Sequence, residues 1–295
     1  MSARIRDRRF ADIVAPEAAC EKVAGGFLFT EGPLWDARSQ SLLFSDIPGN
    51  KITRWDQRNG AQIFRQPSSM SNGLTWDRQG RLLCCEHATS RVTRTDAEGR
   101  ISVVASHYEG KELNSPNDIV VRSDGGIYFS DPSFGRMEYY GVPRAEQMGF
   151  RGVYRAAPDG SGVSLLADDF DQPNGLCFSA DERRLFINDT MRGHIRVFDV
   201  RDDGSLSGSK VWAKPTGEGP GAPDGMKIDS QENLYCCGPG GIHVFDPSAS
   251  CLGVIRVPEG VANFTWGGDN LRELFITATS SVYRLRVLVP GRPVF

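Results

Sequence analysis

The feature that most constrains the fold is a sequence unit that recurs six times along the 295 residues. Each copy starts with an acidic or amide residue, enters an apolar segment that ends in a polar residue, and continues into a second strand-like segment. The six leading residues are Glu31, Asn72, Asn117, Asn174, Asp224 and Asn263. They follow one another at intervals of 39 to 57 residues, and steps of this size match one four-stranded propeller blade.

The repeats predict an all-β protein. No segment shows a sustained apolar period of 3.6 residues, whereas 33 glycines and 17 prolines fit many short strands joined by tight turns. Repeated sheets that cannot bury their own faces share one core when they are arranged radially. We therefore expect a six-bladed β-propeller over residues 13–295, preceded by an N-terminal arm at 1–12. The run Ile13–Phe29 is expected to close the ring by adding a strand beside Val282–Val289.

Charge and composition argue against several classes of partner. The formal net charge is −3, and no basic run beyond Arg4–Arg9 indicates a nucleic-acid-binding surface. The N-terminal residues lack the apolar core of a signal peptide, and no segment is long and apolar enough to cross a membrane. Seven cysteines without zinc-site spacing indicate reduced thiols. We expect a cytoplasmic monomer or small homo-oligomer with no nucleic-acid or membrane partner.

The leading residues predict a metal site on the axis, because equivalent positions on innermost strands face the same channel. All six carry side-chain oxygen donors, and Glu31 and Asp224 are carboxylates. A hard divalent cation takes about six oxygen ligands and prefers anionic ones, so Ca²⁺ is the first expectation, with Zn²⁺, Mg²⁺, Mn²⁺ and Fe²⁺ left open. Alternatively, Pro-Asn-Gly and Pro-Asp-Gly are ordinary turn sequences. A turn does not require Glu31 before Gly-Pro, and oxygen donors stand at the equivalent position of all six repeats. These two observations favour a cation site over six unrelated turns.

Three further residues are candidates for the site. His87 lies in a loop after an apolar strand and could carry a proton or contact a substrate, although a packing histidine is the alternative. Asp131 ends a strand in the third repeat, where it could equally be solvated. Tyr139 lies with Tyr140 and Met148 in the longest interval between leading residues, which predicts a lid or pocket wall or, alternatively, a packed surface loop. No Gly-x-Ser-x-Gly sequence or phosphate-binding glycine pattern occurs.

Five motifs resemble one known family, and they span nearly the whole chain, from Phe27 to Tyr283. The motifs are Glu31-Gly32-Pro33-Leu34-Trp35, Ser115-Pro116-Asn117-Asp118, Tyr128-Phe129-Ser130-Asp131-Pro132, Gln172-Pro173-Asn174-Gly175-Leu176 and Pro223-Asp224-Gly225-Met226. They are similar to those of the gluconolactonase, senescence-marker-protein and luciferin-regenerating-enzyme family. The resemblance implies a six-bladed propeller with one divalent cation in its channel. It implies Glu31, Asn174 and Asp224 as metal ligands, and Asn117 as a contact to the metal or the substrate.

One position departs from part of that family. Vertebrate-type relatives carry an arginine that contacts sugar hydroxyls two residues before the asparagine, and Ser115 stands there in this chain. The stretch Asp131-Pro132-Ser133-Phe134-Gly135 instead resembles the bacterial sugar lactonase branch. The resemblance therefore leaves the acyl substrate open.

The leading functional hypothesis is a metal-dependent hydrolase that opens a sugar lactone, such as a gluconolactone-like aldonolactone, to the aldonic acid. The cation would polarise the carbonyl, and Asp224 would be the general base, with Asp131 or His87 as alternative proton carriers. Asn117, His87, Asp131 and Tyr139 are the expected substrate contacts. The alternatives are a phosphotriesterase on the same metal site and a non-enzymatic binding propeller with a structural metal.

Overall fold

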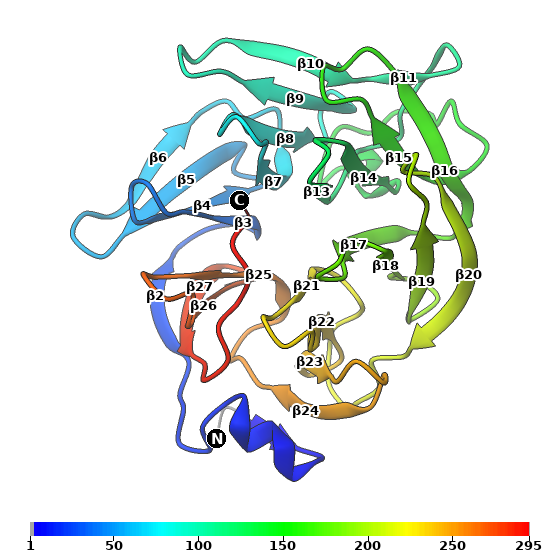
Figure 1. The fold of residues 1–295 in the computed structure, drawn as a ribbon. Coiled ribbons are helices and arrows are strands. Elements are labelled where there is room, and N and C mark those ends of the chain that lie inside the picture. Colours follow the sequence, from blue (N-terminus) through cyan, green and yellow to red (C-terminus); the bar gives the residue numbers. More distant parts are fainter. Residues whose placement is uncertain (1–2, 295) are drawn as a thin grey trace.

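The computed structural model describes residues 3–294, and within them six antiparallel sheets surround a central axis (Figure 1). This arrangement confirms the predicted all-β six-bladed propeller. The first strand of each repeat is the innermost strand of its sheet, and the innermost strands of successive repeats contact one another around the axis. The leading residues of the repeats therefore begin the strands that line the channel.

Each blade contains four strands of one repeat, except that the sixth takes a strand from the N-terminal region. Blade one contains β3 (Thr30–Asp36), β4 (Ser41–Asp46), β5 (Lys51–Asp56) and β6 (Gly60–Arg65). Blade two contains β7 (Ser71–Trp76), β8 (Leu82–Glu86), β9 (Arg91–Thr95) and β10 (Ile101–Ala105). Blade three contains β13 (Ile119–Val121), β14 (Ile127–Asp131), β15 (Arg151–Ala156) and β16 (Val163–Phe170). Blade four contains β17 (Pro173–Phe178), β18 (Arg184–Asp189), β19 (His194–Val200) and β20 (Leu206–Ala213). Blade five contains β21 (Met226–Ile228), β22 (Leu234–Gly238), β23 (Gly241–Phe245) and β24 (Cys251–Ile255). Blade six contains β25 (Val261–Gly267), β26 (Glu273–Ala278), β27 (Ser281–Arg286) and β2 (Glu21–Gly25). The remaining elements are the hairpin β11 (His107–Tyr108) and β12 (Lys111–Glu112), the strand β1 (Ala3–Ile5), and the 3₁₀ turns η1 (Arg8–Asp12) and η2 (Phe134–Arg136).

The N-terminal region closes the ring as the sequence predicts. Strand β2 pairs antiparallel with β27, with Lys22 opposite Tyr283. Of the predicted N-terminal arm, Met1 and Ser2 lie outside the described residues. Strand β1 adds a fifth strand to blade five by pairing with β24, and η1 follows it with a buried Phe10.

Six buried apolar clusters fill the wedges between neighbouring blades within residues 3–294. Aromatic pairs cross these interfaces: Trp35 of blade one stacks on Phe275 of blade six, with ring centroids 5.2 Å apart. Tyr128 of blade three meets Phe178 of blade four edge-on at 5.0 Å. Because each sheet is buried on both faces, the second strand of every blade is almost continuously apolar. The seven cysteines are free thiols, as predicted. No helix in the described part of the chain is long and apolar enough to cross a membrane.

A glycine follows the leading residue in four blades because the next blade passes very close to it. An added Cβ atom would lie 2.0 Å from Asn72 O at Gly32, 2.5 Å from Asn117 O at Gly73, 2.1 Å from Asp224 O at Gly175, and 2.2 Å from Asn263 Oδ1 at Gly225. Each contact is to the leading residue of the following blade. Of these four glycines only Gly32 has a positive φ, of 53°. The glycines therefore serve mainly the approach between blades, rather than the turn geometry considered from the sequence.

We expect Gly175→Ala to lower the free energy of unfolding by about 1–3 kcal/mol or more, because the new methyl group would overlap backbone atoms that cannot move independently. Urea unfolding measures this change. The matched control is Gly162→Ala, where no atom lies within 4 Å of the added Cβ and the stability should change by less than about 1 kcal/mol. Equal stability of the two variants would contradict the role given to the glycine.

Candidate functional site

A cavity of about 160 Å³ lies where the innermost strands begin. Its lining combines five of the six leading residues with a histidine, a threonine and an apolar wall. The lining residues are Phe29, Glu31, Ile47, Asn72, His87, Asn117, Phe134, Tyr140, Asn174, Thr190 and Asp224. The structure thus brings Glu31, Asn117, Asn174, Asp224 and His87 together, and it places Asp131 and Tyr139 outside the lining.

The two carboxylates of the cavity, one buried and one partly buried, lie close enough for the charge of Glu31 to act on Asp224. Glu31 is 4% exposed, and burial, reinforced by the charge of Asp118, raises its pKa to about 7. The pKa of Asp224 is raised well above its usual range, first by burial and then by the charges of Glu31 and Asp118. Two neighbouring carboxylates whose pKa values are both raised by burial and by nearby negative charge mark a place where positive charge is favourable.

A chain of hydrogen bonds links Asn174 to the backbone beside Asp224. Asn174 Nδ2 donates to Thr190 Oγ1 at 3.1 Å, and Thr190 Oγ1 donates to the carbonyl oxygen of Pro223 at 2.8 Å. Thr190 therefore ties the amide of blade four to the Pro223–Asp224 peptide of blade five. The Asn174 carbonyl oxygen is left as an acceptor at the cavity.

His87 is held in one tautomer. The Nδ1 atom lies 2.8 Å from the Tyr140 carbonyl oxygen, and Nε2 lies 3.3 Å from Asn72 Nδ2. A carbonyl can only accept, so Nδ1 carries the proton and Nε2 accepts from the amide. Burial lowers the pKa of His87 to about 4. The ring is therefore neutral near pH 7 and has its unprotonated nitrogen beside Asn72.

The carboxylate of Asp131 is engaged by backbone amides and does not line the cavity. It accepts hydrogen bonds from the amides of Asn114 and Ser115 at 2.8 and 2.7 Å. The same arrangement recurs in two other blades. Asp46 accepts from the amides of Leu28 and Phe29 at 3.1 Å each, and Asp189 from those of Asp171 and Gln172 at 2.7 and 3.2 Å. The position is a repeated device that fixes the loop before the innermost strand, so the proposed site leaves Asp131 out.

Tyr139 lies at the outer surface of the inserted segment. Its side chain is 51% exposed, and its hydroxyl donates to the Leu28 carbonyl oxygen at 3.1 Å. The neighbouring Tyr140 is the tyrosine that lines the cavity, and its ring meets Phe29 edge-on at 5.1 Å. We therefore also leave Tyr139 out of the proposed site.

Most of the chain matches a described family. A sequence model of the SMP-30/Gluconolactonase/LRE-like region matches residues 29–280. The chain belongs to this family. It is 32% identical over 294 residues to a gluconolactonase of Zymomonas mobilis, covering 92% of this chain and 82% of that protein. It is 28% identical to the pentonolactonase XacC of Haloferax volcanii, covering 90% and 93% of the two chains. A solved gluconolactonase structure from Xanthomonas campestris superposes with a TM-score of 0.90 at 33% identity, covering 97% of this chain and 95% of that one.

The side chains that the family resemblance implies as ligands fit a divalent cation. Glu31 and Asp224 supply two carboxylates to the lining, and Asn174 supplies an amide oxygen, which is the hard donor set that such ions prefer. Among residues 3–294 no group of three or more His, Cys, Asp or Glu side chains is arranged to hold a metal. A site here therefore depends on the asparagine oxygen as well as on the two carboxylates.

A layer beneath the cavity contains Asn263 with two residues that the sequence interpretation did not single out, Lys227 and Asp118. Asn263, the sixth leading residue, donates from Nδ2 to Glu31 Oε2 at 3.0 Å and accepts from Lys227 Nζ at 3.2 Å. Asp118 is 6% exposed, and its Oδ2 has no hydrogen-bond partner within the described residues. The sequence contained a signal for Asp118, because it stands where four other blades have glycine.

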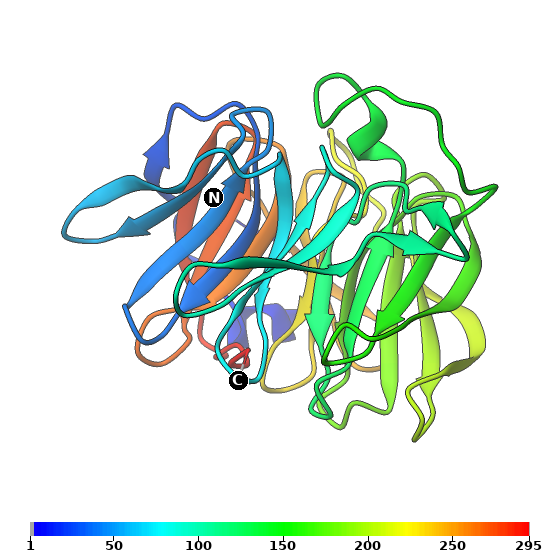
Figure 2. The same ribbon diagram turned by 90° about the horizontal axis from the view of Figure 1, so that it is seen from above.

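The opposite end of the channel is occupied by the C-terminal segment. A second cavity of about 290 Å³ is lined by later residues of the innermost strands, including Lys227, and by Arg292, Pro293 and Val294. Figure 2 shows the segment around η2 rising above one face of the ring and the C-terminus at the other face. The leading residues therefore line only the cavity beneath η2.

The neutral state of His87 gives an expected pH dependence. The unfolded chain binds a proton at His87 near pH 6.5, whereas the folded chain does so near pH 4. The stability that this residue contributes is therefore present above pH 6.5 and is lost as the pH falls toward 4, by about 3 kcal/mol in total.

We expect the difference in unfolding free energy between the wild type and His87→Gln to shrink over this pH interval, as measured by urea unfolding at several pH values. His107→Gln is the control, since its ring is exposed and is bonded to the adjacent Ser106. A pH-independent difference between the wild type and His87→Gln would contradict the burial of a neutral ring.

Proposed function

We propose that the chain is a lactonase that opens a sugar lactone to the corresponding hydroxy acid with the help of one divalent cation. The lactonase relatives support the reaction class, and the 82–97% coverage of the chains supports its transfer to this protein. The observation that carries the metal dependence is the pair of cavity carboxylates, Glu31 and Asp224, whose pKa values are both raised, with the amide of Asn174 in the same lining.

In this proposal Glu31, Asn174 and Asp224 hold the ion at the base of the cavity. When bound, the cation supplies a Lewis acid for the lactone carbonyl and a counter-charge for the oxyanion. Calcium is the first candidate from the hardness of the three oxygen donors. Asn263 stabilises this set by fixing one oxygen of Glu31 through its 3.0 Å hydrogen bond.

The remaining groups orient the substrate and move the proton. Asp224 accepts the proton of the attacking water, whose oxygen bonds to the carbonyl carbon, and passes it to the ring oxygen as the C–O bond breaks. Asn117 faces the same cavity and positions the lactone. His87 Nε2 accepts from Asn72 Nδ2 and so keeps that amide fixed at the cavity wall.

We expect Asp224→Asn to lower kcat/KM for D-glucono-1,5-lactone by at least about 100-fold, because one charge and the proton acceptor are lost together. The amide keeps the size of the side chain, so thermal unfolding should still be cooperative. Asp199→Asn, an exposed position on β19, is the control and should retain full activity. Undiminished turnover by Asp224→Asn would rule out its assigned role.

Chelation should abolish activity, and added Ca²⁺ should restore it. The measurement is the initial rate after EDTA treatment and after return of each divalent cation separately, together with calorimetric titration of the ion.

Glu31→Gln should weaken the affinity for the ion, measured by calorimetry, about tenfold or more, since one of two anionic ligands is removed. A parallel assay with an organophosphate triester tests the alternative hydrolase. Activity that persists without any divalent ion would contradict the proposed metal dependence.

A further inference from the structure

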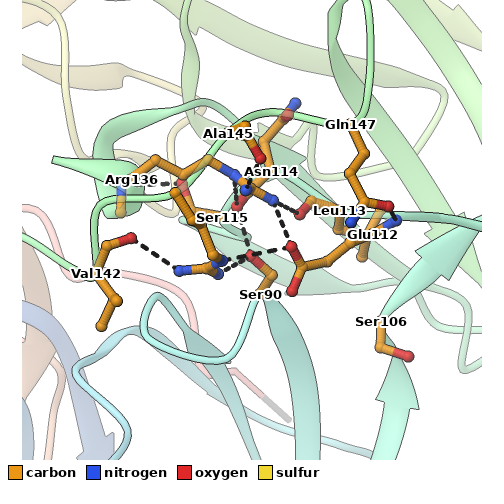
Figure 3. Close-up of polar contacts among 12 residues, drawn as sticks. Ser90, Ser106, Glu112, Leu113, Asn114, Ser115, Arg136, Val142, Ala145 and Gln147 are labelled. Carbon is orange, nitrogen blue, oxygen red and sulfur yellow. Dashed lines mark hydrogen bonds and ion pairs between the residues drawn. The ribbon is translucent and has the colours of Figure 1, made fainter.

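We propose that Phe134 is a specificity-determining residue of the cavity and that Glu112, on the distant hairpin strand β12, is the positioning residue that holds it there. This inference rests on the proposed function for the identity of the ligand. The three residues of η2 face three different surroundings. Phe134 lines the cavity, Gly135 packs on its wall, and Arg136 extends away from it into a polar cluster (Figure 3).

The first anchor of η2 is its middle residue. A Cβ on Gly135 would lie 2.6 Å from both His87 Cγ and Ser115 Cβ, so the turn touches the cavity wall directly. The Gly135 amide donates to Ser115 Oγ at 2.9 Å, and Ser115 Oγ donates to the Pro132 carbonyl at 2.6 Å. The Ser115 hydroxyl is therefore used to hold the turn and is not free for a ligand.

The second anchor is the guanidinium of Arg136, whose side chain is 4% exposed. Each nitrogen of the guanidinium group donates at least one hydrogen bond. The contacts are Nε to Asn114 O at 2.9 Å, NH1 to Ala145 O at 2.6 Å, and NH2 to Leu113 O at 2.6 Å and to Glu112 Oε2 at 2.9 Å (Figure 3). Glu112 provides the only charged contact among these described partners, so it is the group that balances a buried cation.

Glu112 also holds the far end of the same segment. Its Oε2 lies 3.4 Å from Arg144 Nε, and its amide donates to Gln147 Oε1 at 2.9 Å. Arg144 in turn donates to the His87 carbonyl oxygen at 3.2 Å and to the Ser90 hydroxyl. One carboxylate thus fastens the inserted segment on both sides of Tyr140, whose carbonyl fixes the His87 tautomer.

The chemistry of the cavity defines what Phe134 would recognise. Phe134, Phe29, Ile47 and Tyr140 form an apolar wall opposite the oxygen donors, and the charged lining residues are Glu31 and Asp224. No arginine or lysine lines this cavity within the described residues, so it suits a neutral ligand. A lactone ring can place its carbonyl toward the donors and a C–H face on the Phe134 ring.

The test combines kinetics with hydrogen exchange. Phe134→Ala should raise KM for D-glucono-1,5-lactone about tenfold with kcat changed by less than about twofold, because a contact made equally in the ground and transition states is lost. Glu112→Gln, which keeps shape and removes charge, should raise KM about fivefold. In Glu112→Gln the amides of Met137 and Val142, bonded to Phe134 O and Gly135 O, should exchange at least about tenfold faster.

A double variant separates positioning from general destabilisation. If Glu112 acts through Phe134, the combination of Glu112→Gln with Phe134→Ala should show the KM of Phe134→Ala alone rather than the product of the two effects. Asp169→Asn is the matched control, because it breaks the Arg196–Asp169 pair at 2.8 Å between blades three and four and should leave KM and the η2 amides unchanged.

Multiplicative KM effects, or an unchanged KM in Glu112→Gln, would overturn the positioning role. An unchanged KM in Phe134→Ala would overturn the specificity role. If the wild type opens no lactone, the role in lactone binding falls with the proposed function. The exchange measurement, which needs no substrate, then still decides whether Glu112 anchors η2.

Discussion

The close approach of successive blades at the axis is the constraint on which the rest of the structure depends. In four of the six blades the innermost strand begins so close to the leading residue of the next blade that there is no room for a methyl group on its backbone. Glycine allows this contact, and the contact draws the leading side chains into a small volume. The cavity and its concentrated oxygen donors are a result of this packing, since residues spaced far apart in sequence are brought to one point.

That concentration of donors has an electrostatic cost in the protein itself. Glu31 and Asp118 are buried and Asp224 is partly buried; the charge of Asp118 raises the pKa of Glu31, and the charges of Glu31 and Asp118 raise that of Asp224. Lys227 offsets part of this charge from beneath, where it donates to Asn263 and lowers the pKa of Asp118. The arrangement leaves Glu31 and Asp224 as the carboxylates at the cavity, with the lysine on the side of the channel away from it. A bound cation, as proposed above, would complete such a set, because Lys227 offsets only part of the negative charge.

The sequence contained most of the fold and part of the candidate site. Repetition located the six blades, the leading residues and the closure by the N-terminal strand, because each repeat carries the same local pattern. The repeats could not separate Asp131 from the cavity residues. Two backbone amides of a loop in the same blade donate to its carboxylate, and the sequence of a strand end does not show such hydrogen bonds. The repeats also could not assign Tyr140 rather than Tyr139 to the cavity. Which tyrosine points inward depends on contacts of Arg136 and Arg144 with the β12 hairpin, which precedes them by more than twenty residues.

The pairing of β2 with β27 has a consequence for how the protein is made on the ribosome. The strand at residues 21–25 leaves the ribosome early, but its partner at 281–286 emerges only after five blades have been synthesised. Until then blade six is incomplete and the apolar faces of blades one and five lack a neighbour. Ring closure is therefore a late event in synthesis, and an interrupted nascent chain exposes the kind of surface that chaperones bind.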